Sequence, residues 1–480
     1  MPTSPSSDLL IYLGANAHKE LVHQLLEINP RIRFVESAVY PEQIQSQFDD
    51  KLSQESVIEF DADLVREPGE IRFTPVNGQN NRQIIEAVMS DKLLPLLWSR
   101  SNRQARKNNQ SEIKRYEVTY SLVKSALRAC EELKPKAVFF SYEPHMLPLY
   151  IFKKVCIALE IKTLTRVLSP FIWRMFLEVE DGDGVGFIRP IKKNESKSES
   201  VKKFIEEKKS DYAVAKPFYE KSVRGGAVKH FTKILEVNGY NPYKIILRQL
   251  ALLSYRKLTL KRDRLNDTRY ICVFLQYQPE QTTLPDGGLF VHQLIAIQML
   301  YSVVEPLGIS LVVREHPSTF KHVFNPDWRP KDYYSAIQEI GPNIYFDDLD
   351  ADPYALLNNS IGVAAITGSV LLESLLQGRL AIAFGKHTLK GYSGAGFVSN
   401  FSDEKELRAK IKKALDERPA SIIAEVEGYL NAVYPRTFGT REYVGNDKMS
   451  LDKVREDCYA AIKQVVQYVR EEDLSRETII

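Results

Sequence analysis

The sequence predicts an α/β protein with two doubly wound halves that face a cleft, followed by a helical C-terminal tail. Short apolar runs alternate with segments of helical periodicity in both halves, as in parallel sheets covered by helices. Several of these runs lead directly into small or polar residues, as strands do at a ligand-binding edge. Residues 401–480 keep a helical period without strand signals. Each half is therefore expected to be Rossmann-type.

The first α/β domain is expected over residues 1–180. Its elements are predicted as strands at 9–13, 137–140 and 161–165, and helices at 19–26, 111–133 and 147–159. The strand assignments depend on continuous apolar runs, and the long helix on apolar residues three and four positions apart. Residues 43–85 are polar and show little periodicity.

Residues 181–268 have a different composition, which we interpret as an insertion followed by a basic helical linker. The run Asp181-Gly-Asp-Gly and the Lys- and Ser-rich residues after it are typical of an exposed, mobile loop, here expected over 178–209. Residues 210–265 show a helical and basic pattern.

The second α/β domain is expected over residues 269–400, with the helical tail at 401–480 packing back on the domains. Its elements are predicted as strands at 270–275, 309–313, 344–346, 361–366 and 380–384, and helices at 290–301, 353–358, 369–377, 404–416 and 451–470. The regular alternation of strand and helix indicates a parallel sheet. Ligands bind such sheets at the carboxyl ends of the strands, so the loops after strands are the candidate sites.

Composition excludes several classes of protein. Lys and Arg total 65 and Asp and Glu 62, so the net charge is +3 and gives no sign of nucleic-acid binding. The four cysteines stand far apart, which excludes a Cys-x-x-Cys metal knuckle and favours a reducing compartment. Neither a signal-peptide pattern nor a run of about 20 apolar residues is present, so we expect a cytoplasmic protein.

The run Arg314-Glu-His-Pro ends the strand at 309–313. His316 is then expected at the carboxyl end of a strand, where an imidazole can donate to a phosphate or act as an acid or base. Arg314 would add a cation, although the alternation of side chains along the strand could instead bury or expose it. The alternative is a histidine that only caps the loop.

The run Thr367-Gly-Ser369 joins the strand at 361–366 to a helix. Small residues at this place let backbone N–H groups approach a phosphate. Glu373 follows Ser369 by one helical turn and could accept hydrogen bonds from both ribose hydroxyls of a nucleotide. The alternative is an ordinary helix start with a solvated glutamate.

The polar loop over 276–288 carries two carboxylates, Glu280 and Asp286. A carboxylate near a sugar carbon can act as a base or nucleophile. Asp286 precedes Gly287, so a purely local turn is the alternative for it. In the first half, Glu143 and His145 follow the strand at 137–140 and are candidates for contact with an acceptor, or else only start a helix.

Four motifs in order carry a resemblance: Gln-Pro-Glu-x-Thr-Thr from Gln278, Glu-His-Pro-Ser from Glu315, Thr-Gly-Ser-x-x-x-Glu from Thr367, and the run from Gly378 to Gly385. Over about residues 270–400 the chain resembles bacterial capsule polysaccharide biosynthesis proteins, which include relatives of the capsule Kdo transferases. The resemblance is looser over 137–166.

This resemblance implies a GT-B glycosyltransferase that moves a sugar from a nucleotide-activated donor, such as CMP-Kdo, to a surface or capsular polysaccharide. A leaving nucleotide phosphate needs charge stabilisation, which a histidine and a helix N-terminus can supply without a metal, so we expect a metal-independent enzyme with no cofactor. The resemblance implies that His316 and the turn at 367–369 contact the donor phosphate. Kdo transferases carry an aspartate in the first loop of this half, and either Glu280 or Asp286 fills that place here. The expected site comprises catalytic Glu280, His316 and Asp286; donor-binding Arg314, Thr367, Gly368, Ser369 and Glu373; and acceptor-side Glu143 and His145.

Three other functions fit the same pattern. A nucleotide-sugar epimerase has this architecture and needs no acceptor. A polyol-phosphate transferase would release CMP from CDP-glycerol. A non-catalytic polysaccharide assembly subunit would keep the fold and bind glycan without turnover.

The partners expected are a nucleotide sugar and a glycan or glycolipid acceptor, which places the protein at the inner face of the bacterial inner membrane. Residues 244–264 interleave leucine and isoleucine with arginine and lysine. Such a basic amphipathic helix can lie on anionic lipid as a peripheral membrane contact. The alternative is a helix that bridges domains with a solvated face.

Overall fold

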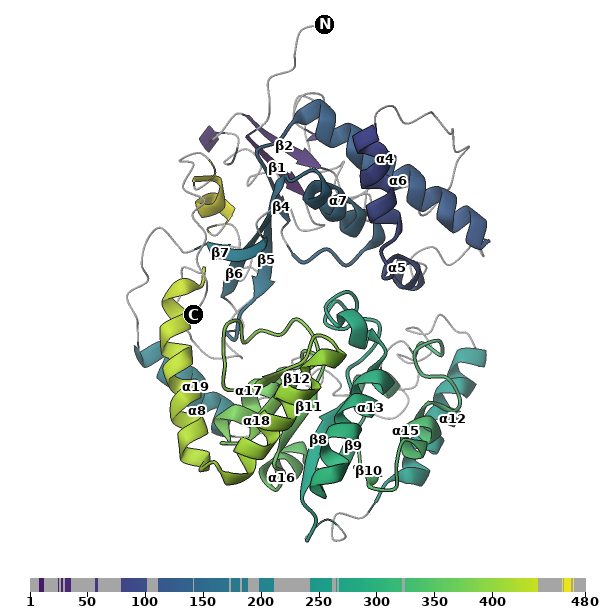
Figure 1. Cartoon of the computed structure of the whole chain (residues 1–480), viewed down its shortest axis with the longest axis vertical. Helices are drawn as coiled ribbons and strands as arrows, with labels where there is room; N and C mark the ends of the chain where they lie inside the picture. Colours follow the sequence, from purple (N-terminus) through teal and green to yellow (C-terminus); the bar gives the residue numbers. More distant parts are fainter. Residues whose placement is uncertain are drawn as a thin grey trace, which may run out of the picture. The chain divides into compact units, whose positions relative to one another are not determined.

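A computed structural model describes residues 8–12, 25, 27–28, 31–35, 57–58, 79–101, 111–140, 142–171, 174–181, 184–188, 198–210, 242–260, 265, 267–321, 324–438, 460, 462–467 and 469. The chain forms two compact units (Figure 1). Unit 1 comprises Met1–Ser196, Val433–Glu442 and Met449–Ile480, and unit 2 comprises Lys197–Ala432 and Tyr443–Lys448. Both are α/β, as the sequence predicts.

Unit 1 is built on a seven-stranded sheet in the order β3-β2-β1-β4-β5-β6-β7. The strands are β1 (Leu9–Tyr12), β2 (Ile32–Val35), β3 (Val57–Ile58), β4 (Ala137–Phe140), β5 (Lys162–Leu168), β6 (Met175–Asp181) and β7 (Gly184–Ile188). The first five pair in parallel, and β6 and β7 are antiparallel. β1 and β4, at the centre of the sheet, are short apolar runs, which suits strands that are covered on both faces.

Four helices of unit 1 pack with one another and with the sheet: α4 (Gln79–Met89), α5 (Leu94–Ser101), α6 (Glu112–Leu133) and α7 (Leu147–Ala158). The Ser111 side chain accepts a hydrogen bond from the Lys114 N–H and so caps the start of α6. A core cluster of the sheet also contains Phe438, Val465, Val466 and Val469, which come from the end of the chain. These described residues of the expected tail therefore belong to the core of unit 1.

The exposed, mobile loop predicted over 178–209 is replaced by regular structure in its described parts. β6 and β7 pair from Leu177↔Ile188 to Asp181↔Gly184, and they form the edge of the unit 1 sheet. The Asp-Gly-Asp-Gly run therefore joins two strands of a hairpin, for which such turn residues are typical. Helix α8 (Ser198–Ser210) belongs to unit 2. Residues 182–183 and 189–197 lie outside the described residues.

Unit 2 holds a six-stranded, fully parallel sheet in the order β10-β9-β8-β11-β12-β13. The strands are β8 (Tyr270–Phe274), β9 (Ser310–Arg314), β10 (Ile344–Phe346), β11 (Gly362–Ala365), β12 (Leu380–Ala383) and β13 (Gly396–Phe397). This is the 3-2-1-4-5-6 order of dinucleotide-binding folds, and the strand order reverses between β8 and β11. Ligands bind such sheets outside the carboxyl ends of the strands at this point.

Helices cover the unit 2 sheet on both faces. They are α12 (Pro242–Leu258), α13 (Gln293–Val304), α14 (Ser318–Lys321), α15 (Tyr333–Glu339), α16 (Pro353–Asn358), α17 (Val370–Leu376), α18 (Glu404–Asp416) and α19 (Pro419–Val433), with short 3₁₀ turns at Gly288–Val291, Glu305–Leu307, Phe401–Asp403 and, in unit 1, Tyr434–Arg436. Ile271 and Val273 enter the larger core with α12, α13, α15 and α18. Tyr270 and Cys272 enter the opposite core with α16. The alternation follows the two-residue period of a strand.

Candidate functional site

The loops after β8 and β11 are joined by hydrogen bonds at the point where the strand order reverses. The Thr367 N–H donates to Gln276 Oε1 (3.2 Å), and Gln276 Nε2 donates to Thr367 Oγ1 (3.3 Å). Thr367 Oγ1 in turn donates to the Thr282 carbonyl (2.9 Å). The first part of the β8 loop is thereby fixed against the turn that starts α17.

Gln293, at the start of α13, holds the main chain of the same loop. Its Oε1 accepts from the Gln276 N–H (2.8 Å), and its Nε2 donates to the Gln276 carbonyl (2.9 Å) and to Gln278 Oε1 (2.6 Å). Gln278 Nε2 donates to the Val291 carbonyl (2.6 Å). Three glutamines thus give the loop a fixed shape from its first residue.

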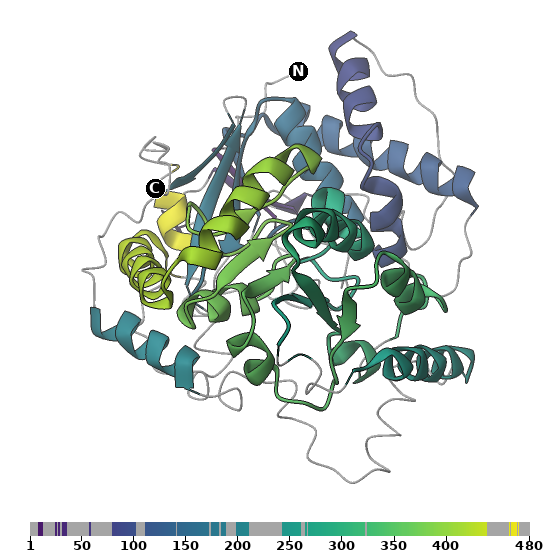
Figure 2. The ribbon, with the colours of Figure 1, turned by 60° about the horizontal axis from the view of Figure 1, so that its bottom comes forward.

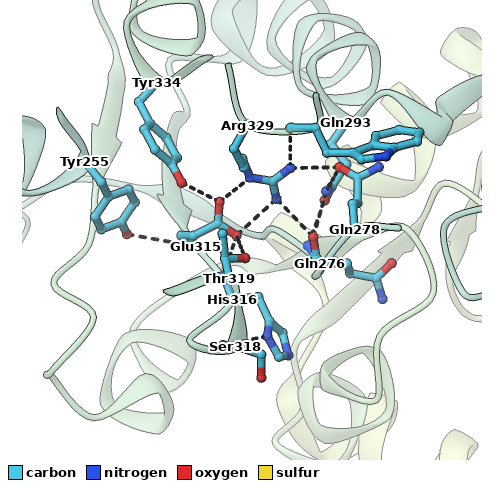
Figure 3. A network of polar contacts seen from close by, with 11 residues as sticks. Tyr255, Gln276, Gln278, Gln293, Glu315, His316, Ser318, Thr319, Arg329 and Tyr334 are labelled. Atoms are coloured by element: carbon cyan, nitrogen blue, oxygen red, sulfur yellow. Dashed lines mark hydrogen bonds and ion pairs between the residues drawn. The ribbon is translucent and has the colours of Figure 1, made fainter. Parts of the chain in front are cut away.

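A buried ion pair between Glu315 and Arg329 connects the end of β9 to this loop (Figure 3). Arg329 Nε donates to Glu315 Oε2 (2.6 Å), and the guanidinium also donates to Gln278 Oε1 (2.9 Å) and the Gln276 carbonyl (3.0 Å). Tyr334 Oη donates to Glu315 Oε2 (2.8 Å), and Arg329 and Glu315 are 3% and 1% exposed. Such a pair needs this many partners because burial removes the hydration of both charges.

Electrostatics keep this pair ionised. Burial alone would raise the pKa of Glu315, but the Arg329 charge and hydrogen bonds from Arg329, Tyr334 and the His316 N–H together lower it. Burial and the Glu315 charge raise the pKa of Tyr334, so its hydroxyl stays protonated and donates the hydrogen bond to Glu315. The network therefore holds one carboxylate and one guanidinium in fixed positions behind the loops.

His316 lies directly after this buried pair and is half-buried. Its N–H donates to Glu315 Oε1 (2.7 Å), and its Nδ1 accepts from the Ser318 N–H (3.1 Å). Since Nδ1 is the acceptor, the neutral ring carries its proton on Nε2 and can donate it. The His316 ring also lies beside that of Tyr277 in the β8 loop, with centroids 6.4 Å apart. The predicted contact of His316 with a donor phosphate stays a prediction.

Arg314 has an internal role that the sequence did not predict. Its side chain is 3% exposed and forms an ion pair with Asp347. It also donates to three carbonyls of the loop after β10, those of Asp348 (2.6 Å), Leu349 (3.0 Å) and Ala351 (2.8 Å). Arg314 therefore stabilises that loop, and this geometry gives no support to its predicted contact with a donor.

The turn Thr367-Gly368-Ser369 lies where the sequence places it, but its hydroxyls have protein partners. Thr367 is 7% exposed and bonded as described above. A Cβ on Gly368 would stand 3.2 Å from Gln276 Nε2, so the glycine lets the β8 loop approach closely. Ser369 is exposed and donates through Oγ to Glu373 Oε1 (3.2 Å).

Glu373 faces Lys208 of α8, with 3.9 Å between Lys208 Nζ and Glu373 Oε1. Both side chains are about nine-tenths buried, at 10% and 11% exposure. Burial raises the pKa of Glu373, and Lys208 and the Ser369 hydroxyl only partly oppose the shift. The predicted ribose contact by Glu373 stays a prediction, and Lys208 is a cation at this place that the sequence analysis missed.

The two candidate carboxylates of the β8 loop differ in environment. Glu280 is exposed, and its carbonyl accepts from the Thr283 and Leu284 N–H groups (3.0 and 2.7 Å). Asp286 is half-buried, and its carbonyl accepts from the Lys386 N–H (2.8 Å) after β12. Their predicted catalytic roles stay predictions, because the structure does not choose between them.

In unit 1, Glu143 pairs with Lys153 of α7 (3.3 Å), and the same ammonium lies near Glu180 (3.5 Å) of β6. His145 Nδ1 lies 2.9 Å from the Glu143 carbonyl, and its ring is beside that of Tyr142. The structure thus gives Glu143 and His145 contacts inside unit 1, and their acceptor-side role stays a prediction.

The sequence analysis missed the residues that organise the site, namely Glu315, Arg329, Gln276, Gln278 and Gln293. A signal was available for Glu315, because a charge at the end of an apolar strand needs a partner when buried. Arg329 had no such signal, because its neighbours in the sequence are typical of an exposed loop. In the described part of the chain, no group of three metal-ligating side chains is close enough to hold a metal ion.

No family model and no curated protein matches this sequence. Solved structures give weak matches. UDP-GlcNAc 2-epimerase from Methanocaldococcus jannaschii, in complex with UDP-GlcNAc and UDP, is 10% identical, with 96% of this chain and 99% of that chain covered and a TM-score of 0.27. The N-terminal domain of trehalose-6-phosphate phosphatase from Candida albicans is 9% identical, with 98% and 100% covered and a TM-score of 0.32.

KpsC from Thermosulfurimonas dismutans, a β-Kdo 2,7 transferase, is 11% identical, with 60% of this chain and 80% of that chain covered and a TM-score of 0.25. Similarities this weak carry no argument about activity. The functional conclusion therefore depends on the site itself.

Proposed function

We propose that this protein is a glycosyltransferase whose unit 2 binds a nucleotide-activated sugar at the carboxyl ends of β8, β9 and β11. One observation carries the proposal: the loops after these strands form one hydrogen-bonded assembly where the strand order reverses, with His316 half-exposed and able to donate from Nε2. A nucleotide phosphate is the ligand class that this position and this donor suit.

In the proposed reaction, the bond between the sugar's anomeric carbon and the donor phosphate oxygen breaks, and a bond to an acceptor hydroxyl forms. Negative charge grows on the leaving phosphate, and the Nε2–H of His316 stabilises it. Glu280 or Asp286 takes the acceptor proton or attacks the sugar. The acceptor we propose is a growing or lipid-linked surface glycan, and a CMP-ulosonic acid such as CMP-Kdo is the first donor to test.

The experiment measures nucleotide release from CMP-Kdo, CMP-sialic acid, UDP-sugars, GDP-sugars and CDP-glycerol, together with the melting temperature in each donor. We expect one donor to stabilise the fold and to release nucleotide only with a glycan acceptor. His316→Ala should lower kcat/KM about 10²–10³-fold. Asn359→Ala is the matched control, because Asn359 is exposed at the opposite end of β11.

Other outcomes would redirect the assignment. Interconversion of a nucleotide sugar without an acceptor would make the protein an epimerase, and release from CDP-glycerol would make it a polyol-phosphate transferase. Stabilisation by a nucleotide without any turnover would indicate a non-catalytic subunit. If no donor shifts the melting temperature, the site is not a nucleotide site.

A further inference from the structure

Helix α12 carries a stripe of exposed apolar side chains. Tyr243, Ile246, Leu250 and Leu253 are 65%, 57%, 46% and 54% exposed. Their spacing of three, four and three residues places them on one face of the helix. These four residues are called the α12 stripe below. Apolar patches of this kind on a soluble protein mark an interaction site.

The opposite face of α12 is fixed in the core of unit 2. Ala251 and Tyr255 are buried there, with Leu247 packed against the same cluster. Tyr255 Oη donates to the Asp347 carbonyl (2.6 Å), and the Arg248 guanidinium donates to the Phe320 carbonyl (2.8 Å). α12 lies at the outer side of unit 2, next to α15 (Figure 2). Because the opposite face is fixed in the core, α12 cannot rotate to bury the stripe, and the stripe stays exposed in folded unit 2.

The charges of α12 indicate which partner the stripe meets. The helix contains no acidic residue and four cations, of which Arg248 is buried and Arg256 lies 3.5 Å from the exposed Asp350 carboxylate. Arg256 and Lys257 are exposed, one turn beyond Leu253. A second copy of this helix would bring like charges together. The apolar stripe ends at Leu253, and Lys257 follows one turn later. The stripe is therefore much shorter than the three to four heptads that a coiled coil needs. An anionic surface matches both the apolar stripe and the cations.

We propose that the α12 stripe docks unit 2 on a membrane surface rich in anionic phospholipid. The helix lies in the plane of the interface, with the stripe among the acyl chains and with Arg256 and Lys257 at the phosphates. The tyrosine at position 243 suits the boundary between apolar and polar layers. Among the described residues, no helix is long and apolar enough to cross a bilayer.

The test is co-sedimentation of the full chain with vesicles of phosphatidylglycerol and phosphatidylcholine, compared with phosphatidylcholine alone. We expect binding to the anionic vesicles that weakens as salt rises. Ile246→Ser with Leu250→Ser should weaken binding more than tenfold. Arg256→Gln with Lys257→Gln should weaken it roughly fivefold for each cation. The matched control is Ile113→Ser with Tyr116→Ser on α6, two side chains that are 71% and 63% exposed.

Several results would overturn the proposal. The first is no binding of the wild type at millimolar anionic lipid. The second is equal loss of binding in the α6 control. The third is a wild type that sediments as a dimer while the Ile246→Ser, Leu250→Ser variant sediments as a monomer. That result would mean that the stripe binds a second copy of the chain. If that variant does not fold, Tyr243→Ser with Leu253→Ser carries the same test.

Discussion

Arg329 donates hydrogen bonds to the Glu315 carboxylate, to Gln278 and to the Gln276 carbonyl, and so links the end of β9 to the β8 loop. Removing its side chain leaves the Glu315 carboxylate buried without its cation. We therefore expect Arg329→Met to lower the free energy of unfolding by about 3–5 kcal/mol, measured by urea denaturation. Arg256→Met is the control, because its pair with Asp350 is exposed and should change stability by less than about 1 kcal/mol.

A double variant separates the effect of an unpaired Glu315 carboxylate from the effect of losing the Arg329 side chain. Arg329→Met with Glu315→Leu removes both charges, so it should be less destabilising than Arg329→Met alone. An equal or larger loss in the double variant would show that packing, and not the uncompensated carboxylate, causes the effect.

Glu373 predicts a pH dependence of stability. Its pKa is raised in the folded state, so the folded protein binds this proton more tightly than the unfolded chain does. The free energy of unfolding then falls as the pH rises above about 4.3 and through the folded-state pKa. Glu373→Gln removes this loss, so its melting temperature relative to wild type should increase from pH 4 to pH 8. A difference that is constant or reversed would contradict the assignment.

Single residues show what the sequence could and could not predict at the site. The positions of His316 and Thr367 after strand ends were predictable, because each follows an apolar run and leads into a small or polar loop. Lys208 was not, because its contact with Glu373 joins distant parts of the chain. For Arg314 the sequence left burial or exposure open, because a strand-end arginine has the same local pattern whether it binds a ligand or, as here, the loop after β10.

At the scale of elements, replacing two glycines of unit 2 by alanine should change the free energy of unfolding in opposite directions. Gly378 follows α17 at φ +70°, and a Cβ there would stand 2.6 Å from Pro419 Cβ. Gly428 lies within α19, where a Cβ would meet nothing within 4 Å. Gly378→Ala should lower the free energy of unfolding by about 1–3 kcal/mol. Gly428→Ala should raise it by about 0.5–1 kcal/mol. Urea denaturation of both variants checks the pair, and the same sign in both would contradict it.

Strands and helices were predictable where the pattern of apolar residues was regular along the whole element. The expected strand at 344–346 and the expected helices at 353–358 and 404–416 have the observed bounds, and the expected helix at 111–133 differs from α6 by one residue. The weaker elements were missed. β2 has four residues with an arginine among them, and α4 begins in the stretch over 43–85 that showed little periodicity. Most of the expected helix at 451–470 lies outside the described residues.

At the scale of the whole molecule, each unit has its own sheet and its own core. Residues 197–432 form nearly all of unit 2 in one continuous segment. We expect this segment, produced alone, to melt in one cooperative transition and to keep the donor response of the full chain. Circular dichroism and donor-dependent melting check this. A segment without a cooperative transition would show that unit 2 depends on unit 1.

The two α/β domains were predictable from the order of strands and helices, but their boundaries were not. A helical pattern does not tell which core a helix joins, so the expected tail at 401–480 is divided between the units. Phe438, Val465, Val466 and Val469 enter the core of unit 1 although they follow unit 2 in the chain. Such long-range pairing leaves no local trace in the sequence.

This division has a consequence for how the protein is made. The ribosome produces β1 first, yet the core around β1 also needs Val466 and Val469. At 5–20 residues per second, roughly 20–90 s separate the synthesis of these segments. Unit 2 is nearly complete once Ala432 has emerged. The part of the chain that is translated first is therefore the last to finish folding, and until then its strands are exposed to chaperones and to premature association.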